Sequence, residues 1–185
     1  MIDKEILDKT FKQITEENRN ALATGFQDLD ILLSGVEKGN LITIGARPAM
    51  GKTAFALNIA QNVALRANTP VAIFSLEMSK KQLVQRLLCS EAEVDTQRLK
   101  TGNMQAKDWE KLAVAMSSFS EAPIYIDDTA GCTITDIRAK CRRLAMAEKN
   151  LGLIVIDYLQ LIEGTGREDR MQQISSISRG LKILA

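Results

Sequence analysis

The sequence contains no histidine, only three cysteines and no long apolar run among its 185 residues. The lack of histidine excludes His-based acid–base catalysis and His-ligated metal sites. The three cysteines, Cys89, Cys132 and Cys141, are too widely spaced for a metal cluster, and we expect reduced thiols. No apolar run approaches the roughly 18 residues of a transmembrane helix. We therefore expect a cytoplasmic protein.

Positively and negatively charged residues are nearly equal in number. The chain has 24 Lys and Arg against 23 Asp and Glu, a formal net charge of +1. Any binding of nucleic acid must therefore come from a local basic patch and not from overall charge. The remaining composition, 45% hydrophobic and 25% charged, is that of a globular protein with enough residues for one domain and its core.

The first twenty residues differ from the rest. Ile6, Leu7, Phe11 and Ile14 recur at helical spacing, and a polar stretch separates them from the remainder of the chain. We interpret residues 1–20 as a linker helix and residues 21–185 as the domain itself. Packing of this helix on its own domain is the alternative, because the pattern alone does not identify its partner.

Four apolar runs rich in Val and Ile alternate with helical segments in the domain. They do not alternate cleanly between apolar and polar residues, as expected of strands with both faces buried. Two of the helices between them begin with the capping pairs Ser79–Gln82 and Thr133–Asp136. The pattern predicts an α/β domain with a mostly parallel central sheet flanked by helices. The predicted strands are residues 41–46, 71–76, 123–127 and 153–157.

The segment "GARPAMGKTA", residues 45–54, lies between a predicted strand and a predicted helix. This context predicts a Walker A loop, which binds the phosphates of a nucleotide through backbone N–H groups and a helix N-terminus. Lys52 would reach the β- and γ-phosphates, and the Thr53 hydroxyl would ligate Mg²⁺. The strict motif has Gly where this chain has Ala46; the alternative is an ordinary strand–helix turn. The predicted nucleotide-binding residues are Ala46, Arg47, Pro48, Ala49, Met50, Gly51, Lys52 and Thr53.

Acidic residues end two of the other predicted strands. Asp157 closes "LIVID" and resembles a Walker B acid, which would help to hold Mg²⁺. Glu77 in "FSLEMS" could orient and polarise the attacking water, or it could be a solvent-exposed acid, in which case Asp128 is the next candidate. Gln160 could sense the γ-phosphate or form a hydrogen-bonded amide; we favour the amide.

Two basic features could contact a phosphate backbone. The first is the helix after Thr133, with Arg138, Lys140, Arg142 and Arg143; most such helix faces are merely solvated. The second is the segment 163–170, "EGTGREDR", with Arg167 and Arg170, whose charge is nearly cancelled by neighbouring acids. Contact with DNA is an open alternative for both.

Five segments in this order closely resemble the RecA-like motor domain of bacterial replicative DNA helicases, the DnaB family. The resemblance covers essentially residues 21–185. It implies a RecA-like P-loop NTPase that assembles as a homo-hexameric ring, translocates on single-stranded DNA and hydrolyses ATP or another nucleoside triphosphate with Mg²⁺ at subunit interfaces. The segments are "ATGFQDLDILLSG", "GNLITIGARPAMGKTAFALNIA", "FSLEMS", "IVIDYLQLI" and "ISSISRGLKILA".

The resemblance also implies roles for residues. Lys52 and Thr53 would bind nucleotide and Mg²⁺, Glu77 would be the catalytic carboxylate, and Asp157 the Walker B acid. Ala46 would belong to this family's own form of the loop. Segment 163–170 would face the central channel, so that Arg167 and Arg170 join Arg142 and Arg143 as candidate DNA contacts.

Several parts that the family carries are not in this sequence. They are the N-terminal domain that binds primase, a further core strand, a second DNA-binding loop and the arginine finger; a helicase loader would also act through other regions. We therefore expect a fragment of the motor domain with little activity by itself. The alternatives are a recombination ATPase like RecA or RadA and a catalytically silent interaction module. The segments "SLEM" and "DYLQL" favour the helicase.

Overall fold

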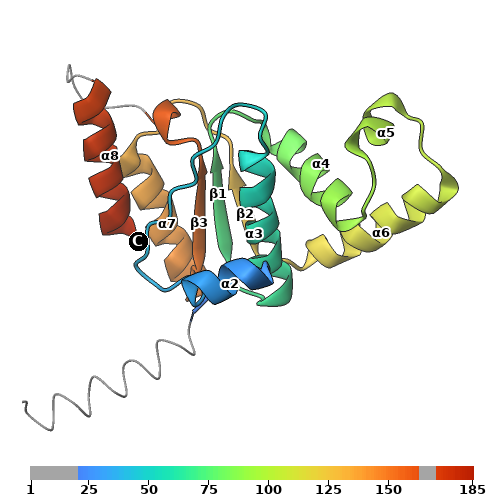
Figure 1. The fold of residues 1–185 in the computed structure, drawn as a ribbon, viewed down its shortest axis with the longest axis horizontal. Helices are drawn as coiled ribbons and strands as arrows, with labels where there is room; N and C mark the ends of the chain where they lie inside the picture. Colours follow the sequence, from blue (N-terminus) through green and yellow to red (C-terminus); the bar gives the residue numbers. More distant parts are fainter. Residues whose placement is uncertain (1–20, 163–169) are drawn as a thin grey trace, which may run out of the picture.

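The structure is a computed structural model that describes residues 21–162 and 170–185. Within them, three parallel strands form a central sheet in the order β2-β1-β3 (Figure 1). The strands are β1 (Val71–Ser75), β2 (Ile124–Asp127) and β3 (Leu153–Asp157). The helices are α2 (Gln27–Leu33), α3 (Lys52–Arg66), α4 (Lys80–Glu91), α5 (Thr96–Thr101), α6 (Ala106–Ser120), α7 (Ile134–Glu148) and α8 (Arg170–Leu184), with a 3₁₀ turn, η1 (Leu159–Leu161).

Strand β1 is buried along its whole length because it lies between two strands and between two layers of helices. Val71 and Ile73 point to the face covered by α3 and α4. Ala72 and Phe74 point to the opposite face, which α7 and α8 cover (Figure 1). The alternation is the two-residue period of a strand, and it confirms the predicted α/β domain with helices on both faces of a parallel sheet.

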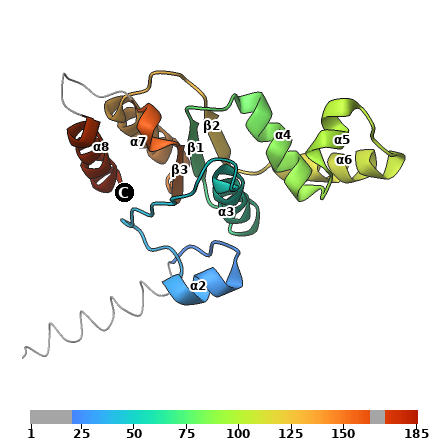
Figure 2. The same cartoon turned by 45° about the horizontal axis from the view of Figure 1, so that its top comes forward.

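A second, smaller cluster lies away from the sheet. Helices α4, α5 and α6 pack on one another at one end of the molecule (Figures 1 and 2). Their shared core is built around Val94, Leu112 and Ala115. Helix α4 belongs to both clusters, because Leu83 and Leu87 pack against β1. It therefore connects the small cluster to the main core.

Both predicted helix starts are confirmed. Ser79 caps α4 and Thr133 caps α7, each in a reciprocal capping box with the residue three positions later. Three of the predicted strands are confirmed as well, with ends that differ by at most one residue.

The predicted strand at residues 41–46 is wrong for this structure. These residues belong to no strand, and Leu41 and Ile42 are 39% and 50% exposed. Among the described residues, β3 pairs only with β1, so its other edge is free. An apolar run forms a strand only where a neighbouring strand pairs with it, and no strand of the described residues pairs with residues 41–46. Apolar composition alone therefore does not form a strand at this place.

Candidate functional site

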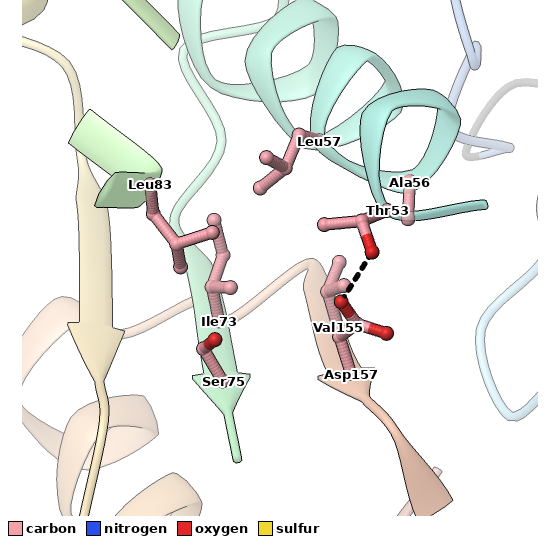
Figure 3. A pocket seen from close by; sticks show the side chains of 8 residues that line it. All are labelled: Thr53, Ala56, Leu57, Ile73, Ser75, Leu83, Val155 and Asp157. Atoms are coloured by element: carbon pink, nitrogen blue, oxygen red, sulfur yellow. Dashed lines mark hydrogen bonds between the residues drawn. The ribbon is translucent and has the colours of Figure 1, made fainter. Parts of the chain in front are cut away.

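The candidate site lies where β1 and β3 end and α3 begins. Ser75, the last residue of β1, is in register with Asp157, the last residue of β3. The first turn of α3 lies opposite, and Thr53 points from it toward Asp157 (Figure 3). The carboxyl edge of a parallel sheet is the usual place for a ligand in this class of fold. Thr53 and Asp157, which were predicted on different segments, are therefore brought together here.

The loop before α3 is exposed from residue 45 to residue 51. The Met50 N–H donates to the Arg47 carbonyl at 3.3 Å, which closes a turn around Pro48. Gly51 occupies the N-cap of α3 with a φ of 86°, a left-handed conformation that favours glycine. No side chain caps this helix, so the N–H groups of its first turn stay available to an anion.

Asp157 connects the loop to the sheet. Its carboxylate accepts a hydrogen bond from the Thr53 hydroxyl at 2.6 Å and forms an ion pair with Lys52 at 3.0 Å. Asp157 itself is only 6% exposed, so this acid is held in a site with little water. The Lys52 ammonium also lies over the Tyr158 ring, 4.4 Å from its centroid. These contacts bring together the three residues expected to bind triphosphate and metal.

The chemistry of these side chains fits a hydrated Mg²⁺. That ion prefers oxygen ligands, keeps several waters and is commonly held by one or two protein oxygens together with phosphates. The Thr53 hydroxyl and the Asp157 carboxylate are two such oxygens at 2.6 Å from each other. No group of three or more acids, cysteines or histidines gathers into a metal site within the part of the chain that the structure describes. The donor set therefore suits a metal shared with a nucleotide.

Glu77 is an exposed residue in the short connection between β1 and α4. It leaves the sheet at the same edge as Asp157, because the Leu76 N–H donates to the Asp157 carbonyl at 2.8 Å. Its carboxylate is thus on the site's edge of the sheet and open to solvent. A carboxylate so placed is available to act on a water molecule.

Asp128 lies at the end of β2 but is engaged elsewhere. Lys80 is the first residue of α4. The Asp128 carboxylate accepts a hydrogen bond from the Lys80 backbone N–H at 2.8 Å and forms an ion pair with the Lys80 ammonium at 3.4 Å. The backbone hydrogen bond is the main cause that lowers the pKa of Asp128. This contact makes Asp128 a support of α4. Sequence reasoning missed that role, since the two partners are 48 residues apart.

The neighbouring acid, Asp127, is also paired. It forms an ion pair with Lys140 at 2.6 Å and accepts a hydrogen bond from the Thr129 N–H at 2.9 Å. Burial by itself would raise the pKa of Asp127, but the bonds from Lys140 and Thr129 outweigh it and lower the pKa to about 2. Lys140 also contacts the buried Cys132 thiol. Lys140 is thus tied to the end of β2.

The other basic candidates lie away from the loop before α3. Arg142 and Arg143 are exposed on α7, which covers the face of the sheet opposite to α3. Arg167 lies outside the described residues. Arg170 begins α8, but its side chain is outside the described part. Gln160 is exposed in η1, and its amide has no hydrogen-bond partner within residues 21–162 and 170–185. The described residues therefore do not support the interpretation of Gln160 as a hydrogen-bonded amide.

Comparisons with known proteins point in one direction. The model of the family described as DnaB-like helicase C terminal domain matches residues 21–185. The replicative DNA helicase DnaB of Geobacillus stearothermophilus is 55% identical over 189 residues, and the replicative DNA helicase DnaC of Bacillus subtilis is 51% identical over 189 residues. Each alignment covers 98% of this chain and 41% of the relative. The chain thus spans about two fifths of the length of these relatives.

Two solved structures share the fold. One is the ATPase domain of another protein, with a TM-score of 0.90, 34% identity and coverage of 99% of this chain and 67% of that one. The other is a DnaB-like replicative helicase described with its interactions with primase, with a TM-score of 0.88, 34% identity and coverage of 100% and 45%. Separately, no described helix is both long and apolar enough to cross a membrane.

Proposed function

Because the chain belongs to the DnaB-like helicase C-terminal domain family, we propose that it is the nucleotide-hydrolysing motor of a replicative DNA helicase. Its substrates would be ATP with Mg²⁺ and single-stranded DNA, along which hydrolysis would drive translocation and unwinding in the cytoplasm. The observation that carries the proposal is Asp157, which is buried at the end of β3 and holds both Lys52 and Thr53 of the phosphate loop.

In this proposal the phosphate loop, residues 46–53, binds the triphosphate. The backbone N–H groups at the start of α3 and the Lys52 ammonium would neutralise the phosphate charge. For this, Lys52 must turn from Asp157 toward the phosphates, which frees the carboxylate to face the metal together with Thr53. The Thr53 hydroxyl and the Asp157 carboxylate would hold Mg²⁺, which when bound would supply neutralisation of the phosphate charge.

Glu77 is assigned to the attacking water. Its exposed carboxylate would orient the water and accept its proton. The exposure of Glu77 and its place on the edge shared with Asp157 support the assignment, whereas Asp128 is already engaged with Lys80. The Lys52 ammonium would stabilise the negative charge that develops on the leaving phosphate.

The proposal extends to DNA and to partners of the whole protein. The relatives are named replicative DNA helicases, and one similar structure was described with primase. We therefore propose that the whole protein is a homo-hexamer that binds nucleotide at its subunit interfaces. We also propose that it interacts with primase and with a helicase loader. Arg142, Arg143, Arg167 and Arg170 are the candidate DNA contacts; the exposure of the first two on α7 supports them. The family match favours this function over a recombination ATPase.

The test is Glu77→Gln in the complete protein. This substitution keeps the shape of the side chain but removes the carboxylate. We expect nucleotide binding to persist and DNA-stimulated turnover to fall about 100-fold or more, within the range of general-base effects. Glu110→Gln, on the exposed surface of α6, is the matched control and should leave turnover unchanged. Turnover that survives Glu77→Gln contradicts the assignment of Glu77.

A further inference from the structure

The connection that carries Glu77 is short, and both of its ends are fixed. It follows Ser75, the last residue of β1, and ends at Ser79, the N-cap of α4. Leu76 and Met78, the two neighbours of Glu77, pack against opposite cores: Leu76 on the side of α7 and Met78 on the side of α3. Glu77 alone is exposed between them. Residues two apart in a strand share a face, so the strand alternation ends after Leu76, and the turn leaves Glu77 exposed between the two cores.

Ser75 closes the turn on the strand side. Its hydroxyl donates to the Met78 carbonyl at 2.7 Å and accepts from the Met78 N–H at 3.2 Å. Ser75 is 1% exposed and lines the small pocket between β1, β3 and α3 (Figure 3). One buried hydroxyl thus satisfies both backbone groups of Met78, which fixes the backbone on either side of Glu77.

Asp128 fixes the turn on the helix side. Its carboxylate bonds the Lys80 N–H at 2.8 Å and pairs with the Lys80 ammonium at 3.4 Å. These bonds tie the first residue of α4 to the end of β2. The turn therefore has two independent anchors, one within its own strand and one on the neighbouring strand.

We propose that Ser75 and Asp128 are positioning residues for hydrolysis, which hold the exposed Glu77 carboxylate at a fixed distance from the reacting water. The proposal rests on the proposed role of Glu77. Neither residue touches the nucleotide in this assignment; both act through the backbone of residues 76–80. Displacement of a catalytic group by about 1 Å can lower a rate by about 100-fold, so loss of one anchor should lower kcat and leave KM nearly unchanged.

The first experiment is a double-mutant cycle on the complete protein, with Ser75→Ala and Glu77→Gln alone and together. Single-turnover ATP hydrolysis gives the rate, and a fluorescent ATP analogue gives the affinity. We expect Ser75→Ala to lower the rate about 10-fold with unchanged nucleotide affinity. In the Glu77→Gln background the same substitution should have no further effect, because the group it positions is already gone. Ser75→Thr, which keeps the hydroxyl, should restore most of the rate.

A purely structural role for Ser75 predicts a different result. Loss of folded protein would lower the rate equally in both backgrounds and would lower the amount of nucleotide bound. Either of these results overturns the proposal, as does a Ser75→Ala enzyme with the wild-type rate. If Glu77→Gln alone keeps full turnover, the role proposed for Glu77 fails, and the positioning proposal fails with it. A loss confined to Glu77→Gln rejects only the positioning of Glu77 by Ser75.

The second experiment separates Asp128 as an anchor from Asp128 as a base. Asn at this position keeps an oxygen that can accept from the Lys80 N–H, whereas Ala keeps none. If Asp128 is an anchor, Asp128→Ala should lower kcat about 10-fold, whereas the kcat of Asp128→Asn should stay within about threefold of the wild type. If Asp128 is instead the catalytic base, both variants would lose activity to the same extent, because neither keeps a carboxylate. Equal losses in the two variants therefore overturn the positioning role.

Discussion

Residues 41–46 and strand β1 have similar sequences and opposite surroundings. "LITIGA" and "VAIFS" are both short, apolar and rich in β-branched residues, and each leads directly into a loop with proposed chemistry. Every residue of β1 is buried, and the strand is paired on both edges. Residues 41–46 have no strand partner among the described residues, and Ile42 is 50% exposed.

The difference shows what a strand requires beyond composition. β-propensity describes how well a side chain fits a pleated, half-buried surface, and that surface exists only where neighbouring strands and helices supply it. Strand β1 has β2, β3 and two helical layers. Within the described residues the outer edge of β3 is unpaired, and residues 41–46 do not bond to it.

The largest expected effect comes from a matched pair of Ile→Ala substitutions in the two segments. Ile73 is 1% exposed in β1, so Ile73→Ala should lower the free energy of unfolding by about 2–5 kcal/mol through lost burial and a cavity. Ile42→Ala should change it by less than about 0.5 kcal/mol, because half of the side chain is already in water. Urea unfolding measures both.

Equal losses for the two variants would contradict the comparison. They would mean that residues 41–46 are packed in solution much as β1 is. The same result would indicate that a partner, such as another segment or a second copy of the chain, covers Ile42 and completes the sheet.

The next largest effect is expected on nucleotide binding, in the loop that follows residues 41–46, and is compared with the loop that follows β1. Lys52 is the first residue of α3 and pairs with Asp157. Lys52→Ala should lower nucleotide affinity or turnover at least about tenfold, or about 1.4 kcal/mol, because it removes the cation proposed to reach the terminal phosphates. Titration with a fluorescent nucleotide measures the affinity. Glu77→Gln, in the loop after β1, should spare that affinity, so the two loops would separate into binding and chemistry.

Lys38→Ala is the control for Lys52→Ala. Lys38 is exposed just before residues 41–46 and lies outside the phosphate loop. Its removal changes the net charge by the same amount and should leave binding unchanged. A loss of affinity in Lys38→Ala equal to that in Lys52→Ala would contradict the assignment of the Walker A loop, since overall charge would then explain both.

The smallest effect concerns β2, which is paired on one edge only among the described strands. Asp127 at its end has its pKa lowered to about 2 from 3.8, so its stabilisation is complete above about pH 4 and is lost as pH falls toward 2. The pair is partly exposed, so we expect no more than about 1 kcal/mol. Asp127→Asn should remove this part of the acid dependence, measured by urea unfolding between about pH 6 and pH 2.5. An identical pH dependence in both proteins would contradict it.

The sequence by itself determined the elements whose signals are local. The capping pairs at Ser79 and Thr133 act within one helical turn, and both are found where expected. The start of α3 is also local, since a glycine, a lysine and a threonine in consecutive positions open it. Three of the apolar runs form strands because each finds a parallel neighbour.

Only the tertiary structure decided which segments meet. Thr53 and Asp157 are 104 residues apart in sequence and share a hydrogen bond, and Asp128 supports a helix that begins 48 residues earlier. The free edge at β3 and the exposure of residues 41–46 likewise depend on neighbours, not on the segment itself, within the described part of the chain. Local patterns fix backbone preference over a few residues, whereas hydrogen-bond pairing and burial depend on contacts between segments distant in the chain.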